Sequence, residues 1–152
     1  MPIPDAYICL RKVSAGHGAG TVIDSLSLSI AKGETIAILG RNGVGKTTLL
    51  ATLMGHTRQS GGEIAFNGAV ISAWPTWRRA RSGLALVPQE REIFPSLTVE
   101  QNLEVAARGS HWSLKRVYAL FERLHERRQN LGSQLSGGEQ QMLALGRALM
   151  GS

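Results

Sequence analysis

Short apolar runs separated by polar or glycine-rich segments fill the first half of the chain. Residues 7–10 and 26–30 are expected to form strands, and the second run alternates apolar and polar residues as a half-buried strand does. Between them, residues 14–20 contain so many glycines that we expect only a turn or loop. Residues 31–34 are then expected to make a tight connection to the next apolar run.

That next run, Thr35 to Leu39, is continuously apolar and β-branched, which is typical of a strand buried on both faces of a parallel sheet. A glycine-rich loop follows, and then a helix is expected over residues 47–54. Residues 63–71 carry Asn67-Gly68 between two apolar arms, the dipeptide favoured in a type I′ hairpin turn. Residues 84–88 are expected to form another short buried strand.

From Thr98 onward the apolar spacing becomes helical. Thr98 and Gln101 have the spacing of a capping box at a helix start. A second helix is expected from Ser113 to about Arg127, with an apolar stripe spaced by three or four residues: Leu114, Val117, Leu120, Phe121 and Leu124. A third helix is expected to begin after Ser136. The pattern therefore predicts an α/β fold with an antiparallel element.

Composition and charge narrow the picture only slightly. The chain has 152 residues and one cysteine, Cys9, which excludes an internal disulfide framework and fits a buried core position in a reducing compartment. The net charge of +6 favours an anionic partner, and nucleotide, nucleic acid and an anionic membrane surface all fit it. The arginines at 78, 79 and 81 and those at 123, 127 and 128 are expected to lie on solvated helix faces.

The segment from Gly40 to Thr47 matches G-x-x-x-x-G-K-[ST], and it lies between an expected buried strand and an expected helix. The glycines let successive backbone N–H groups turn toward phosphate oxygens, and the helix start adds the positive end of its dipole. Lys46 can reach the β- and γ-phosphates, and the Thr47 hydroxyl can bind Mg²⁺. The loop predicts nucleotide binding but does not name the reaction.

A second motif, Leu-Ser-Gly-Gly-Glu-Gln-Gln, occupies residues 135–141. A capping box explains Ser136 and Glu139, but it does not explain Gly137 and Gly138, because glycine costs about 1 kcal/mol relative to alanine inside a helix. Two glycines in a first turn let another backbone or a phosphate group approach the bare helix start. The motif therefore predicts a second phosphate site.

Together the two motifs resemble those of ATP-binding subunits of ABC transporters, and Val87-Pro88-Gln89 is similar to the Q-loop of that family. The resemblance covers nearly the whole chain. It implies a P-loop NTPase fold with an antiparallel β subdomain and a helical subdomain. It also implies three regions: a β-rich and phosphate-loop core at about 1–88, a Q-loop and helical subdomain at 89–135, and a signature helix at 136–152.

The resemblance further implies an ATP-hydrolysing enzyme in which two nucleotide-binding subunits close head to tail on ATP and Mg²⁺. Gln89 would contact Mg²⁺ or the attacking water, with Lys46 as the other catalytic group and Thr47 as the other Mg²⁺ ligand. His17 stands where the family usually has an aromatic residue that stacks on adenine. In the cis subunit ATP would lie against Gly40, Arg41, Asn42, Gly43, Gly45, Lys46, Thr47 and Thr48, and in trans against Ser136, Gly137 and Gly138.

The family's next element is a buried strand ending in Asp-Glu, followed further on by a histidine, and none of these is present after Met150. We therefore expect a core sheet that is incomplete on its C-terminal side. Since phosphoryl transfer depends on a group that orients the nucleophile, we expect this chain to bind ATP without efficient hydrolysis.

Residues 87–103 resemble the ATP-binding subunits of branched-chain amino acid importers, and also those of urea importers. The implied partners are transmembrane permease subunits and a second nucleotide-binding subunit, on the inner face of the plasma membrane. A non-hydrolysing nucleotide-binding module remains an alternative. A nucleic-acid-associated ATPase is a weaker one, because the basic clusters lack interleaved aromatics, and no nucleic acid is expected as a partner.

Overall fold

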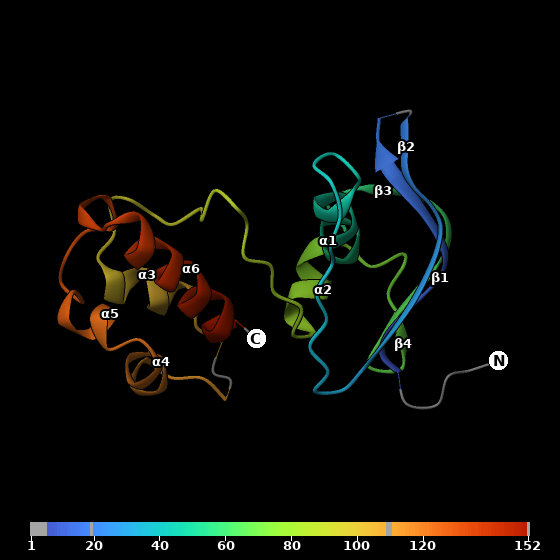
Figure 1. The fold of residues 1–152 in the computed structure, drawn as a ribbon. Coiled ribbons are helices and arrows are strands. Elements are labelled where there is room, and N and C mark those ends of the chain that lie inside the picture. The colour runs from blue at the N-terminus through green and yellow to red at the C-terminus, as the bar shows by residue number, and fades with distance from the viewer. Residues whose placement is uncertain (1–5, 19, 109–110, 152) are drawn as a thin grey trace. The chain divides into compact units, whose positions relative to one another are not determined.

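The computed structural model describes residues 6–18, 20–108 and 111–151. These residues form two compact units, one ending at Arg79 and the other beginning at Ala80. In Figure 1 the first unit runs from blue to green and the second from green-yellow to red. Among the helices of the described residues, none is long and apolar enough to span a bilayer.

A four-stranded antiparallel sheet with the strand order β2-β1-β3-β4 forms the first unit, and the helix α1 packs on it against β1, β2 and β3. The central strand β1 pairs Leu10 with Leu28 on one side and with Ile64 on the other. The elements up to the unit boundary are β1 (Ala6–His17), β2 (Gly20–Ala31), α1 (Lys46–Met54), β3 (Arg58–Phe66), β4 (Ala69–Val70) and the short helix α2 (Thr76–Arg81), which crosses it.

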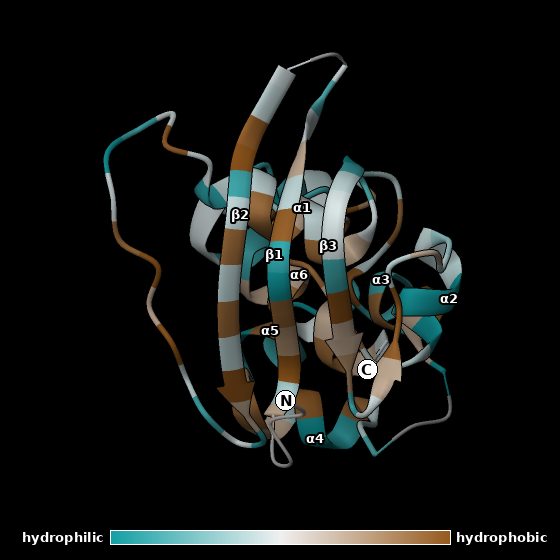
Figure 2. Ribbon diagram, turned by 90° about the vertical axis from the view of Figure 1, so that its right-hand side faces the viewer, coloured by the Kyte–Doolittle hydropathy of each residue, from teal (hydrophilic) through white to brown (hydrophobic). Residues whose placement is uncertain are grey.

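The expected strand over residues 26–30 and the expected hairpin over 63–71 are both confirmed. Along β2, Leu26, Leu28 and Ile30 are half-buried and the residues between them are exposed, and Figure 2 shows the matching apolar and polar bands. At the turn between β3 and β4, Asn67 has φ 47° and Gly68 has φ 79°. Positive φ at both central positions is what a type I′ turn requires.

The glycine-rich segment expected to be a loop is mostly strand, so that prediction is wrong for residues 14–17. The strand β1 continues to His17, which pairs with Gly20 across a turn at Gly18. A side chain at Gly16 would place its Cβ 1.8 Å from the carbonyl oxygen of Gly20. Glycine is therefore present because two backbones approach closely, which a strand permits as readily as a loop.

Two expected strands, 35–39 and 84–88, are not strands in the structure. Both segments lack ladder pairing with any described residue and run as coil, and Figure 2 shows the segment between β2 and α1 as a free trace with apolar stretches. Leu39 is 88% exposed, and Ile36 and Ile38 are also exposed. A parallel strand exists only when neighbours pair with its N–H and C=O groups, and apolar composition alone supplies none.

The second unit is a cluster of helices around one apolar core. Gly146 lies where the helices come closest, since a Cβ there would be 2.9 Å from Leu103 and 3.1 Å from Val117. The core residues are Val99, Leu103, Val117, Leu124, Leu135, Leu143 and Met150. The elements are α3 (Val99–Ala106), α4 (Leu114–Leu120), α5 (Glu122–Glu126), a 3₁₀ turn (Gly132–Gln134) and α6 (Gly137–Gly151).

Helix starts in this unit follow the sequence, but one long helix does not. The capping box at Thr98 is confirmed, because Gln101 N donates to Thr98 Oγ1 and the Gln101 side chain accepts from Thr98 N. Ser113 caps α4, yet the helix expected over 113–127 breaks at Phe121, where φ is −128° and ψ is 73°. Leu120, expected in the buried stripe, is 57% exposed. The break turns α5 so that Leu124 can enter the core.

Candidate functional site

The glycine loop before α1 has the backbone that an anion-binding loop needs. Gly43 and Gly45 have φ 81° and 105°, in the left-handed region that glycine adopts without strain. Gly45 is the N-cap of α1, and no side chain caps this helix and no acidic residue lies in its first turn. The positive end of the α1 dipole and its unsatisfied N–H groups are therefore left for an external anion.

Lys46 places its ammonium group inside the same loop. Its Nζ donates hydrogen bonds to the carbonyl oxygens of Gly40 and Arg41, each at 2.8 Å. The structure thus brings three of the expected site residues into direct contact. A positive charge and the positive end of a helix dipole meet at one point, which suits a triphosphate.

The two threonines that follow Lys46 have different surroundings. Thr47 is exposed, so its hydroxyl is open to a ligand. Thr48 is buried, and its carbonyl accepts a hydrogen bond from Thr52 Oγ1 at 2.7 Å. Beside the helix start lies an open hollow of about 240 Å³ with mostly apolar walls: Val22, Ile23, Asp24, Leu26, Ile38, Leu39, Val44, Gly45, Lys46 and Leu49.

His17 lies at the end of β1, exposed next to the hairpin turn. Asn42 and Arg41 are exposed on the glycine loop, and Gly40 begins it. His17 and the loop both lie in the first unit, and the exposed His17 ring is open to a ligand.

Gln89 lies in the second unit, exposed in a turn that the hydrogen bond from Arg91 N to the Pro88 carbonyl closes at 3.1 Å. Arg91 has φ 66° and Glu92 has φ 47°, left-handed values that are costly for residues with side chains. The Arg91 guanidinium lies against Gly137, 3.3 Å from where a Cβ would stand, and donates to Gln140 Oε1 at 3.4 Å. Arg91 thus joins the Gln89 segment to the start of α6.

Asn102 fixes the part of this segment between Phe94 and Thr98. The sequence pattern did not identify it as a functional residue. It is fully buried, accepts a hydrogen bond from Phe94 N, and donates to the carbonyls of Phe94, Leu97 and Thr98. The only sequence signal is a polar residue one position before a core leucine in an otherwise amphipathic helix. Such a residue is mostly on the surface, so pattern alone assigns it no role.

The start of α6 forms the capping box expected from Ser136 and Glu139. Glu139 N donates to Ser136 Oγ at 3.3 Å, and Ser136 N donates to Glu139 Oε2 at 2.8 Å. Nothing lies within 4 Å of a Cβ built on Gly138. The side of the helix start at Gly138 is therefore open, while Arg91 stands beside Gly137.

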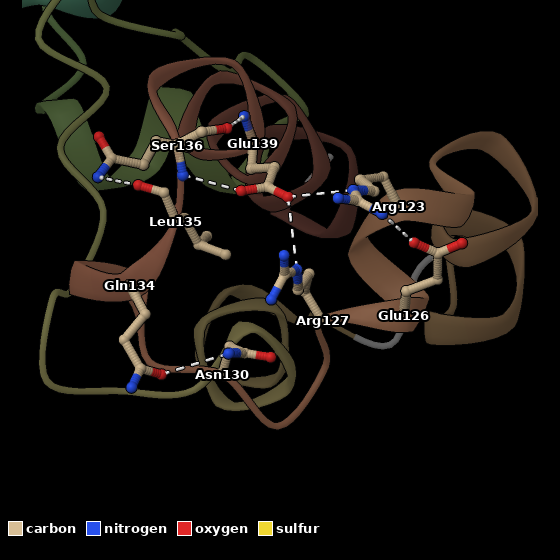
Figure 3. Close-up of polar contacts among 9 residues, drawn as sticks. Arg123, Glu126, Arg127, Asn130, Gln134, Leu135, Ser136 and Glu139 are labelled. Atoms are coloured by element: carbon tan, nitrogen blue, oxygen red, sulfur yellow. Dashed lines mark hydrogen bonds and ion pairs between the residues drawn. The ribbon is translucent and has the colours of Figure 1, made fainter.

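Arg123 is exposed, as expected, and Arg127 is half-exposed, and both also reach Glu139, as Figure 3 shows. Arg123 Nε lies 3.2 Å and Arg127 Nε 3.6 Å from Glu139 Oε1. The hydrogen bonds with Ser136, helped by Arg127 and Arg123, hold the pKa of the Glu139 carboxyl below its ordinary value. The sequence signal for this contact is the i, i+4 spacing of Arg123 and Arg127, because that spacing places both side chains on one side of a helix.

Arg79 contradicts the expectation that these arginines lie on solvated helix faces. Its side chain is 3% exposed, and burial lowers its pKa. It donates to the carbonyls of Thr52 and Leu53 at the end of α1, and to those of Ser72 and Trp74. Nothing in the sequence separates it from its exposed neighbour Arg78, which lies over the Trp74 ring at 4.1 Å.

Known proteins resemble this chain over almost its whole length. The family described as ABC transporter matches residues 23–152. The high-affinity branched-chain amino acid transport ATP-binding protein BraG of Pseudomonas aeruginosa is 40% identical over 91% of this chain and 62% of its own length. The Nod factor export ATP-binding protein I of Paraburkholderia xenovorans is 38% identical over 97% of this chain and 50% of its own.

Solved structures agree with the fold. A structure described as the ATP-binding subunit of an ABC transporter has a TM-score of 0.81 at 25% identity, over 95% of this chain and 62% of that one. A second, the ATP-binding cassette MJ1267 of an ABC transporter, has a TM-score of 0.75 at 22% identity. The chain therefore spans about half to two thirds of the length of the proteins it matches.

Proposed function

This chain belongs to the ABC transporter family, and from that premise we propose that it binds ATP as part of a subunit that energises transport. One observation carries the proposal: the bare start of α1, at a glycine loop with positive φ, holds the Lys46 ammonium group. We assign the loop from Gly40 to Thr48 to the ATP phosphates. Thr47, which is exposed, is assigned to Mg²⁺.

The start of α6 is the proposed second half of the site. We assign Ser136, Gly137 and Gly138 to the terminal phosphate of an ATP molecule held by a second nucleotide-binding subunit. The open approach at Gly138 supports this assignment. Gln89 is assigned to Mg²⁺ or the attacking water, and Arg91 ties its segment to α6. His17, exposed at the hairpin end, is assigned to the adenine ring.

We further propose that the transported solute is a branched-chain amino acid, taken up through permease subunits at the inner face of the membrane. The support is the 40% identity to BraG and the 34% identity to a probable branched-chain amino acid transport ATP-binding protein of Archaeoglobus fulgidus. Nod factor export is the second candidate, since that relative is 38% identical over more of this chain. Import of urea stays open as a third.

For the 152 residues taken alone, binding without efficient turnover is the proposed activity. Lys46 and Gln89 are the residues assigned to the chemistry, and neither carries a carboxylate that could activate the attacking water. Phosphoryl transfer depends on charged groups placed around the transferred phosphate and on a group that orients the attacking water.

Calorimetry with Mg-ATP tests the proposal. We expect saturable binding to the unmutated chain and a loss of about 10- to 100-fold in affinity in Lys46→Ala, because a charge-assisted contact to phosphate is removed. Lys32→Ala is the matched control, since Lys32 is exposed in the turn before the loop and should bind ATP normally. Equal affinity in all three proteins, or no binding at all, would rule the phosphate loop out.

A further inference from the structure

We propose that Arg123 and Arg127 are electrostatic positioning residues for the second phosphate site: they neutralise Glu139, so that the start of α6 attracts a terminal phosphate. The inference rests on the proposed function of Ser136, Gly137 and Gly138. It assigns no contact between either arginine and the nucleotide. Both act through the carboxylate that caps the helix.

Glu139 creates a conflict at this helix start. A carboxylate in the first turn stabilises the helix, because it lies near the positive end of the dipole and accepts the Ser136 N–H at 2.8 Å. The same negative charge repels an incoming phosphate at the neighbouring residues. Glu139 is 8% exposed, so water screens this repulsion only partly. Glu139 is needed to cap the helix, but its negative charge must be offset before a phosphate can bind there.

The two arginines supply that offset from the side of α5. One carboxylate oxygen of Glu139 is engaged by Ser136, and the other lies 3.2 Å from Arg123 Nε and 3.6 Å from Arg127 Nε (Figure 3). Arg123 also bonds Glu126 at 2.6 Å, so its charge is divided between two carboxylates. A substitution of Arg127 therefore tests the contact with Glu139 without also breaking the ion pair with Glu126.

The capping box also prepares the Ser136 hydroxyl. Its oxygen accepts the Glu139 N–H at 3.3 Å, so a lone pair is directed into the helix. A hydroxyl has one proton to donate, and accepting from the helix leaves that proton for an external acceptor. The Arg91 guanidinium beside Gly137 adds a positive charge on another side of the helix start. The local field thus favours an anion despite the buried carboxylate.

The test titrates inorganic tripolyphosphate into the chain and follows the amide signals of Gly137 and Gly138 by NMR. Lys46→Ala is used throughout, so that the loop at α1 does not compete. We expect Arg127→Gln to weaken binding at these amides about three- to tenfold, the range for a charge acting near a helix terminus. Arg127→Gln combined with Glu139→Gln should return the affinity to within about twofold, because the glutamine carbonyl keeps the cap without the charge.

Two further variants separate charge from structure. Arg127→Lys keeps the charge and should bind nearly as well as Arg127. Arg128→Gln removes an equal charge one residue along, where the guanidinium donates to the His125 carbonyl, and should change the affinity less than twofold. Urea unfolding of each variant shows whether the helices remain in place.

Three outcomes would overturn the inference. Unchanged affinity in Arg127→Gln overturns the inference, and so does a loss that Glu139→Gln fails to restore, since that points to a structural role. Absence of saturable shifts at Gly137 and Gly138 in every variant overturns it as well. In each of these cases calorimetry with Mg-ATP on the chain that retains Lys46 reports separately whether the proposed nucleotide function stands.

Discussion

The two helix starts assigned to phosphate, that of α1 and that of α6, are built in opposite ways. The α1 start has a left-handed glycine N-cap, no capping side chain and no carboxylate in its first turn. The α6 start has a complete capping box, with a buried glutamate that two arginines contact. One helix leaves its N–H groups for a ligand, and the other satisfies part of them internally.

The difference shows where each helix is anchored. Arg79 holds α1 at its far end, through the carbonyls of Thr52 and Leu53, so its start can stay bare. Glu139 holds α6 at the start itself, through Ser136 and the arginines of the α5 region. A helix fixed at its C-terminal end can present unsatisfied donors, whereas one fixed at its N-terminal end must neutralise the group that fixes it.

Removing the far anchor of α1 should have the largest effect. Arg79→Ala removes a buried guanidinium that donates to four carbonyls, those of Thr52, Leu53, Ser72 and Trp74, and we expect a loss of about 3 kcal/mol of unfolding free energy in the first unit. Hydrogen exchange of the β1 and α1 amides measures it. Arg78→Ala is the matched control, because Arg78 is exposed and only lies over Trp74. A loss below about 1 kcal/mol in Arg79→Ala would contradict this anchoring.

A side chain at the bare N-cap should come next. Gly45→Ala forces alanine to φ 105° and brings its Cβ 3.1 Å from Val22, so we expect about tenfold weaker Mg-ATP binding, corresponding to about 1–2 kcal/mol of strain. Gly33→Ala has comparable strain at φ 79° in open space, away from the loop. If calorimetry shows both variants equally impaired, general destabilisation rather than loop geometry is the cause.

Alanine at Gly138 should have the reverse effect on stability. Nothing lies within 4 Å of a Cβ there, and alanine favours a helix, so we expect a gain of about 0.5–1 kcal/mol in the second unit. Tripolyphosphate binding at the α6 start should weaken, because the methyl group occupies the open approach. Thermal unfolding and the NMR titration measure the two effects. A gain in stability with unchanged binding would separate Gly138 from the phosphate site.

The smallest expected effect is on pH dependence. The pKa of Glu139 lies below its ordinary value of 4.5, so its stabilising contribution is complete above that pH and is lost as pH falls through the lowered folded pKa. Because the side chains of Arg123 and Arg127 are 54% and 42% exposed, solvent screening keeps this contribution small. The unfolding free energies of the unmutated chain and Glu139→Gln should differ constantly at neutral pH and converge in acid. A constant difference down to about pH 3 would contradict this.

Local chemistry predicted local structure well. The Asn67-Gly68 turn, the capping boxes at Thr98 and Ser136, and the helix after Lys46 all follow from a few neighbouring residues. Each depends on φ preferences or on side chains that bond backbone groups within three residues. Such interactions are complete in the sequence itself, because no distant segment takes part.

Features that need a distant partner were missed or misplaced. Residues 35–39 have strand composition but no ladder among the described residues, and residues 14–17 are strand because β2 and β3 both pair with them. The helix expected to run unbroken stops at Phe121 so that Leu124 reaches the core. Propensity ranks what a segment prefers, and pairing or packing with another segment decides.

The sequence by itself determined the family and the two glycine-rich motifs that we assign to phosphate, because each motif is a local run of residues that fixes the backbone at a helix start. Only the tertiary structure decided which charged side chains lie near those motifs. Arg79 and Arg78 are adjacent in sequence, yet one is buried beneath α1 and the other exposed. Arg123 and Arg127 meet Glu139 only because α5 packs beside α6. A long, flexible side chain interacts with the groups that folding brings within its reach. The distance to those groups cannot be read from spacing along the sequence.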